Sequence, residues 1–387
     1  MALFPVAVIT LFWKHDIGLD MAEILLLQGI FGLSMAIFEF PSGYLADRIG
    51  YRRTLMGASA VIALGWAGYT VAGTFWEVAL AEMALGFGMS LVSGCDTALL
   101  YESLLETEEE ESYGRWLGRV RFFGQSAEGT AALVAGLLFA FSARLPFVLQ
   151  VGLWILNLGV AWSLVEPQRR PQPRRSHVEN VMQIVRTALL SGGRLRAVIA
   201  LAILFGLASF LPVWLVPLYA AEAGVPVPWL GPVWAVANYT VALGSLWSDR
   251  ARRKLGLAGL LLVASGLIAV GYVGLGLTQA LFGFAFYFAL TTMRGLVGPA
   301  LAHREQRLIP STDRAGFLSL RSLLFRLVFL AGAPLVGLAI DVQGQHVVLL
   351  GVGALLVPAT LLGVARARAL GVFREESLPG GPSPERA

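Results

Sequence analysis

Long apolar runs, separated by short charged or turn segments, restrict this chain to few folds. A helix rises 1.5 Å per residue, so a run of about 20 residues crosses a hydrocarbon core of about 30 Å. Twelve runs cover 2–13, 21–46, 54–73, 76–104, 116–140, 145–165, 195–220, 226–248, 255–276, 278–301, 315–339 and 344–365. Because 57% of the residues are hydrophobic and 14% charged, a soluble protein is disfavoured. We therefore predict an all-α membrane protein with twelve transmembrane helices.

The first run differs from the others because it is short. Residues 2–13 give about 20 Å of helix, which does not span a bilayer. One interpretation is a re-entrant stub. We favour a truncated helix 1, with about 10–20 further residues encoded upstream of Met1; in-frame stop codons directly upstream would exclude this.

Arginine is distributed unequally between the two sets of loops. One set holds most of the arginines, including Arg48, Arg52, Arg250 and the arginines of 166–194, and the other offers little beyond Lys14 and Arg144. The positive-inside rule places the arginine-rich loops and the carboxy terminus in the cytoplasm. Lysine occurs only at positions 14 and 254, which is typical of a GC-rich bacterial genome. We expect a multi-pass protein of the bacterial inner membrane.

A segment rich in proline and arginine divides the chain near its middle. We predict an N-terminal six-helix bundle at 1–165, a cytoplasmic linker at 166–194 and a C-terminal six-helix bundle at 195–366. The tail at 367–387 is charged and rich in proline and glycine, so we expect disorder.

A constant offset of about 202 residues relates the two halves, in line with a parallel transporter repeat. It maps Asp47-Arg48 onto Asp249-Arg250, Gly114 onto Gly316, and Arg119 onto Arg321. We therefore expect two pseudo-symmetric bundles.

Two loops carry a resemblance to a known family. Residues 43–53 read GYLADRIGYRR and residues 244–250 read GSLWSDR. The first resembles the signature loop between helices 2 and 3 of the major facilitator superfamily, and the second is similar to its degenerate copy. Residues 93–104 and 309–320 resemble segments of a large bacterial group whose substrates are mostly unassigned. Two departures are Glu82, where many members have arginine, and the absence of a Gly-Pro motif in 129–136.

The signature loop also has a physical interpretation. Gly43 and Gly50 permit close helix packing and a tight turn. The Asp47 carboxylate, beside Arg48 and Arg52, suits the positive end of a helix dipole. The resemblance implies that this helix is helix 11, which starts near Gly316, and that the contact is a cytoplasmic gate. Asp249 and Arg250 form the second copy. The alternative is that the loop only sets topology.

Ionisable residues inside the membrane are costly, so they usually face a cavity or a partner. At mid-membrane depth we predict that Glu128 faces Asn238, and a buried glutamate of this kind is our first candidate for carrying a proton. Glu82 is the second candidate. Glu39 and Arg326 lie at matching depth on helices 2 and 11, which predicts an ion pair; the alternative is that each pairs within its own half.

The remaining membrane charges lie nearer the cytoplasm or on helix 10. We expect Asp96, Glu102 and Arg119 to form a charge cluster that supports the gate. Arg294 faces either an anionic substrate group or a partner such as Glu305.

These features favour a secondary transporter that moves a small organic solute by alternating access. The chain has no Gly-x-x-x-x-Gly-Lys-Ser/Thr motif for ATP, so we expect proton coupling, with efflux of amphipathic compounds as the first hypothesis. The alternatives are proton-coupled transport of an anionic metabolite and a lipid flippase. The scattered histidines predict neither a metal site nor an enzyme. We expect no cofactor and no nucleic-acid partner, only substrate, proton and lipid bilayer, with the protein a monomer.

Overall fold

The structure is a computed structural model that describes residues 3–167, 193–308 and 314–373. Within these ranges a few side chains lie outside the description, among them those of Asp47 and Arg121 and every side chain from 314 to 318. The described residues are almost entirely helical and contain no strand.

The helices closely follow the predicted apolar runs. They are α1 (Ile9–Leu11), α2 (Met21–Ile49), α3 (Tyr51–Val71), α4 (Phe75–Glu106), α5 (Tyr113–Phe141), α6 (Leu145–Ser163), α8 (Gly193–Glu222), α9 (Leu230–Leu277), α10 (Tyr287–Leu308), α11 (Arg314–Gln343) and α12 (Gln345–Ala369). In the described part of the chain, nine helical segments are long and apolar enough to cross a membrane. The exact number of twelve spans stays a prediction.

Helix α9 shows why a count of helices and a count of spans differ. Its 48 residues would extend about 72 Å, more than twice the hydrocarbon core. Gly256 interrupts it with a φ of 70°, a conformation that glycine adopts without strain. This break lies close to the loop predicted between 248 and 255.

Two predicted boundaries differ from the structure. Run 2–13 does not form one helix, because α1 is followed directly by a π-helix at Phe12–Ile17. Run 278–301 becomes a helix only at Tyr287, after a 3₁₀ turn at Gly283–Phe286, and α10 continues to Leu308. The apolar residues before Tyr287 do not extend α10. Gly283 packs closely against Tyr219 there, because a Cβ on Gly283 would overlap the Tyr219 hydroxyl, which donates to the carbonyl of Thr278.

Capping residues fix the starts of two helices at one end of the molecule. The Asp20 carboxylate accepts a hydrogen bond from the amide of Glu23, 2.7 Å away, and the Glu23 side chain accepts from the Asp20 amide. Thr74 and Glu77 form the same capping box at α4. We call this end, with the loops around 18–20, 72–74, 142–144, 223–229 and 344, the outer end, following the predicted orientation.

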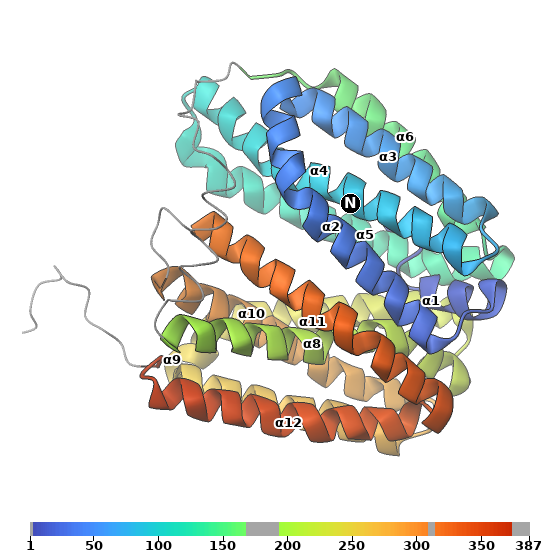
Figure 1. The fold of residues 1–387 in the computed structure, drawn as a ribbon, viewed down its shortest axis with the longest axis vertical. Coiled ribbons are helices and arrows are strands. Elements are labelled where there is room, and N and C mark those ends of the chain that lie inside the picture. Colours follow the sequence, from blue (N-terminus) through green and yellow to red (C-terminus); the bar gives the residue numbers. More distant parts are fainter. Residues whose placement is uncertain (1–2, 168–192, 309–313, 374–387) are drawn as a thin grey trace, which may run out of the picture.

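The helices form two groups that lie against each other (Figure 1). Helices α2 to α6 form the first group, and α8 to α12 form the second. The two groups meet where α2 packs on α11 and where α5 packs on α9. The predicted bundles at 1–165 and 195–366 stay a prediction, and most of the linker and tail lies outside the described residues.

Small residues bring the two groups close together near the outer end. A Cβ on Gly231 of α9 would overlap the carbonyl oxygen of Ala132 on α5, and one on Gly136 would overlap the carbonyl oxygen of Val227. On the other side, a Cβ on Gly337 of α11 would lie 2.5 Å from the Met21 oxygen of α2. Glycines therefore permit direct backbone packing here, as in other membrane helix pairs.

Candidate functional site

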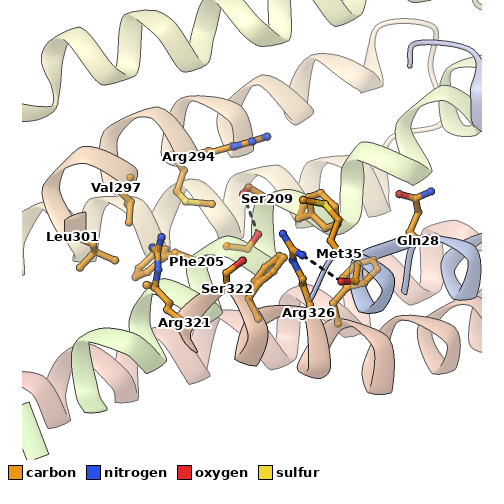
Figure 2. Close-up of a pocket in the computed structure, with 18 of the residues that line it drawn as sticks. Gln28, Met35, Phe205, Ser209, Arg294, Val297, Leu301, Arg321, Ser322 and Arg326 are labelled. Carbon is orange, nitrogen blue, oxygen red and sulfur yellow. Dashed lines mark hydrogen bonds between the residues drawn. The ribbon is translucent and has the colours of Figure 1, made fainter. Parts of the chain in front are cut away.

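A cavity of about 450 Å³ lies between α2, α8, α10 and α11 (Figure 2). It therefore has walls from both helix groups. Five of its lining side chains are phenylalanines, namely Phe31, Phe205, Phe210, Phe325 and Phe329. Gln28, Ser209 and Ser322 add neutral polar groups. This size suits a small organic molecule.

Three arginines line the same cavity. Arg294 comes from α10, and Arg321 and Arg326 come from α11 (Figure 2). Arg326 donates through Nη1 to the carbonyl of Gly32 at 3.3 Å, which is a neutral partner. The Arg321 Nη1 lies 3.6 Å from Oε2 of Glu305. The lining is therefore apolar with a concentration of positive charge.

The predicted pair of Glu39 and Arg326 takes a different form in the structure. The two side chains lie on the contacting helices α2 and α11, and their charges act on each other. Their hydrogen bonds go elsewhere: Glu39 accepts from the hydroxyl of Ser319 at 2.9 Å, and Arg326 donates to Gly32. Both bonds still connect α2 to α11.

Glu128 is half-buried on α5. The positive charge of Arg294, across the interface, acts on its carboxylate. Asn238, its predicted partner, donates to the carbonyl of Trp234 on its own helix at 3.0 Å. Glu128 and Arg294 form no ion pair among the described residues, so only their charges relate them.

Glu82 lies within the N-terminal helix group. It is 3% exposed and accepts a hydrogen bond from the hydroxyl of Tyr69. The Tyr69 ring packs against the aromatic rings of Trp13 and Phe147. Glu82 is not among the residues that line the cavity, so its bond with Tyr69 makes it part of the packing of this group.

The signature loop is described only in part. Arg48 lies over the ring of Tyr44, with its guanidinium carbon 5.2 Å from the ring centroid. In the second copy, Asp249 pairs with Arg252 at 2.8 Å and with Arg253, while Arg250 is exposed. The Asp47 side chain and the surroundings of Gly43 and Gly316 lie outside the description. The gate contact between Asp47 and helix 11 therefore stays a prediction.

The predicted charge cluster of α4 and α5 shows other contacts. Arg119 lies over the ring of Trp116, 4.9 Å from its centroid. Asp96 accepts from the amide of Thr97 at 2.6 Å, and Glu102 is half-buried. Whether these charges act together on the gate stays a prediction.

Residues 1–306 match the family described as Major Facilitator Superfamily. The chain belongs to this superfamily. Its helical fold, its membrane spans and its transporter-like architecture agree with that membership. It is therefore a multi-pass membrane protein of a family of transporters.

Relatives within the superfamily are similar to this chain in different ways. The inner membrane transport protein YajR of Escherichia coli (strain K12) is 37% identical over 60 residues, which are 16% of this chain and 13% of that protein. The crystal structure of a mutant of the nucleoside transporter NupG has a TM-score of 0.78 at 12% identity, covering 95% of each chain. A POT family transporter in complex with 5-aminolevulinic acid has a TM-score of 0.71 at 14% identity, covering 95% of this chain and 93% of that one. At such identities the two structures show the shared fold alone.

In this superfamily member, Glu166 completes the signature loop in a way that the sequence did not reveal. Its carboxylate oxygens accept from the amides of Tyr51 and Arg52, each at 2.7 Å. These amides begin α3, where the helix dipole favours an anion. Gly50 has a φ of 99°, and a Cβ there would lie 2.9 Å from the Glu166 carboxylate. The available signal was an acidic residue that follows an apolar run and precedes Pro167.

A second unpredicted carboxylate connects the two helix groups at the outer end. Asp341, near the end of α11, accepts from the amides of Met21 and Ala22 at 3.0 and 3.1 Å. These amides are at the start of α2, and the Lys14 amine lies 4.0 Å from Asp341. We call this contact the outer latch. Since it joins α11 to α2, it must break when the outer end opens.

We expect Asp341→Asn to favour opening of the outer end, because an amide loses the charge–dipole attraction, worth about 0.3–2 kcal/mol. A reporter cysteine can replace Leu330 of α11, which lies against Gly29 of α2. The only native cysteine is Cys95, which is buried. In a Cys95→Ala background, Asp341→Asn should accelerate labelling of the cysteine at position 330 by an impermeant maleimide. Glu222→Gln, which changes an exposed carboxylate at the outer end of α8, is the control. Equal labelling rates in Asp341→Asn and its parent would contradict the latch.

Proposed function

We propose that this protein is a proton-coupled secondary transporter of a small organic anion, working by alternating access in the bacterial inner membrane with its carboxy terminus in the cytoplasm. The observation that carries the proposal is the cavity between the two helix groups with Arg294, Arg321 and Arg326 in its walls. A site reached by rocking two helix groups is how transporters with internal repeats work.

The charge of the cavity supports an anionic substrate. An arginine within a membrane costs at least about 2.5–3.5 kcal/mol, so arginines there usually have a partner or a function. The charge of Glu39 acts on Arg326 and that of Glu128 on Arg294, but neither arginine forms an ion pair in the described part of the structure. The hydrogen bond of Arg326 goes to a carbonyl. A carboxylate or phosphate matches the planar donors of arginine. The phenylalanines then suit the apolar body of the same molecule.

Efflux of an amphipathic compound remains a second candidate, because the cavity lining is largely apolar. The arginines restrict it, since an amphipathic cation would enter a site of like charge. We therefore favour the anionic alternative.

For proton coupling, Glu128 remains our first proposed carrier. It is half-buried on α5, and the charge of Arg294 acts on it across the interface. Glu128→Gln should lower accumulation driven by a pH gradient and leave substrate exchange at equal pH intact, because exchange requires rocking but no net proton movement. Proteoliposome assays with and without a gradient measure both. Unchanged gradient-driven accumulation would exclude this role, and Glu82 and then Glu39 would be tested next.

Ligand binding tests the substrate class directly. The purified protein is heated with 4-phenylbutyrate or benzylphosphonate, and a bound ligand stabilises the folded state by mass action. Both anions should raise the melting temperature, whereas benzyl alcohol and benzyltrimethylammonium, of similar apolar body, should not. Stabilisation by the cation but by neither anion would contradict the proposal.

A further inference from the structure

The buried carboxylate of Glu305 lies beside Arg321 at the edge of the cavity. Glu305 lies in the last turn of α10 and is 1% exposed. Arg321, on α11, lines the cavity, and 37% of its side chain is exposed. The charged partner of this carboxylate therefore also faces the space where we place the substrate.

The charged atoms of Glu305 and Arg321 lie beyond hydrogen-bonding distance of each other. The closest approach is 3.6 Å, and neither carboxylate oxygen of Glu305 has a hydrogen-bond partner among the residues whose side chains are described. The Arg321 Nε also has none. Glu82 and Glu39 differ, because Tyr69 and Ser319 donate hydrogen bonds to them. A buried carboxylate without hydrogen bonds depends on its single cation, and losing that cation leaves an uncompensated buried charge.

We propose that Glu305 is a proton-binding site and that it shares Arg321 with the acidic group of the substrate. This inference rests on the proposed function, namely that the substrate is an organic anion. In the free protein, the Glu305 carboxylate is the counter-ion of Arg321. When the substrate takes over Arg321, Glu305 binds a proton, so that no unpaired charge stays buried.

Several charged groups on the neighbouring helices α8 and α9 have partners of their own. On α9, Asp249 is held by Arg252 and Arg253, and His303 of α10 acts on the same Asp249. On α8, Arg194 donates to the carbonyl of Leu370. Among the charged groups that the structure describes on these helices, Arg321 is the one whose charge acts on Glu305.

The charges balance without any electron transfer. Glu305 gains one proton and becomes neutral, Arg321 stays a cation, and the substrate anion replaces the carboxylate as its counter-ion. One monoanion and one proton thus enter the site together. This predicts symport, so that an inward proton gradient drives uptake rather than efflux.

Proton uptake during binding tests the inference. Titrating 4-phenylbutyrate into the purified full-length protein, in buffers that differ in ionisation enthalpy, measures the protons bound with each anion. Above neutral pH, the wild type should take up close to one proton per anion. Glu305→Gln should take up almost none, and its affinity should stay nearly constant with pH while that of the wild type weakens as pH rises. The exposed Glu222→Gln is the matched control that should keep the uptake. Glu128→Gln is measured beside it, because Glu128 is the alternative proton carrier.

Three outcomes separate this inference from the proposed function. Wild-type proton uptake in Glu305→Gln, with anion binding intact, would overturn the role of Glu305 and leave the anion transporter standing. Loss of uptake in Glu128→Gln alone would move the coupling proton to Glu128. No anion binding by the folded wild type would overturn both. If Glu305→Gln does not fold, Arg321→Gln serves instead: it should bind the anion at least tenfold more weakly and without proton uptake.

Discussion

Arg326→Gln should weaken binding of 4-phenylbutyrate by about 30-fold or more. Arg326 projects into the cavity from the middle of α11, and its hydrogen bond in the described structure goes to the neutral carbonyl of Gly32. Truncating one member of a buried charge pair costs about 2–5 kcal/mol, and 1.4 kcal/mol is a factor of ten in affinity. Glutamine keeps a donor for Gly32 but cannot neutralise an anion.

Two further variants make this result interpretable. Arg326→Lys keeps the charge but loses the planar donor pair, so we expect an intermediate loss of affinity. Arg253→Gln removes an arginine that pairs with Asp249 outside the cavity, and binding should not change. Isothermal titration measures all three. Equal affinity of Arg326→Gln and the wild type would show that the substrate does not use this arginine.

Gly231→Val should reduce transport more than tenfold. A Cβ at position 231 would overlap the carbonyl oxygen of Ala132, so α9 and α5 have to separate near the outer end. Overpacking of this kind costs about 1–3 kcal/mol, which acts against every state in which this end is closed. Valine itself is no worse than glycine inside a helix, so the effect reports the contact.

The matched control is Gly266→Val, on the same helix α9, where a Cβ would meet nothing within 4 Å. It should transport like the wild type. Maleimide labelling of a cysteine at position 330 gives a second readout, because separation of the helix groups should expose it in Gly231→Val. Wild-type transport and labelling in Gly231→Val would contradict the closed contact between α5 and α9.

The fold was largely predictable because the thickness of a bilayer sets the length of the apolar runs that cross it. Apolar runs bounded by charges gave the ends of most helices within a few residues, and two loops identified the family. The errors came where apolarity and helicity separate. Most of residues 278–286 are apolar, but Gly283–Phe286 form a 3₁₀ turn. Gly283 packs there against Tyr219 of α8.

The site was only partly predictable because depth along a helix does not determine rotation about its axis. Depth identified Arg294 and Arg326, which do line the cavity. It placed Glu39 opposite Arg326, yet the hydroxyl of Ser319 binds that carboxylate. Glu305 was named only as an alternative partner of Arg294, whereas in the structure it lies beside Arg321. The predicted helix 10 ended at residue 301, so Glu305 was placed in a loop rather than in a buried last turn.

Contacts between distant segments were the least predictable. Glu166 and Asp341 each bind amides at the start of a helix more than a hundred residues away. A free amide at a helix start is a common feature of every helix, so the sequence does not indicate which carboxylate will reach it. Only the packed structure gives this information.

Accumulation of 4-phenylbutyrate in proteoliposomes with an imposed pH gradient, beyond that in protein-free liposomes, tests the central claim most directly. The protein-free liposomes are needed because the neutral acid crosses a bilayer unaided. The account predicts accumulation on the alkaline side of the membrane, by a mechanism that moves one anion with one proton. A membrane potential should change this little when the pH gradient is held constant, because the pair carries no net charge. Absence of accumulation by protein that binds the anion, or accumulation of benzyltrimethylammonium in its place, would contradict the account.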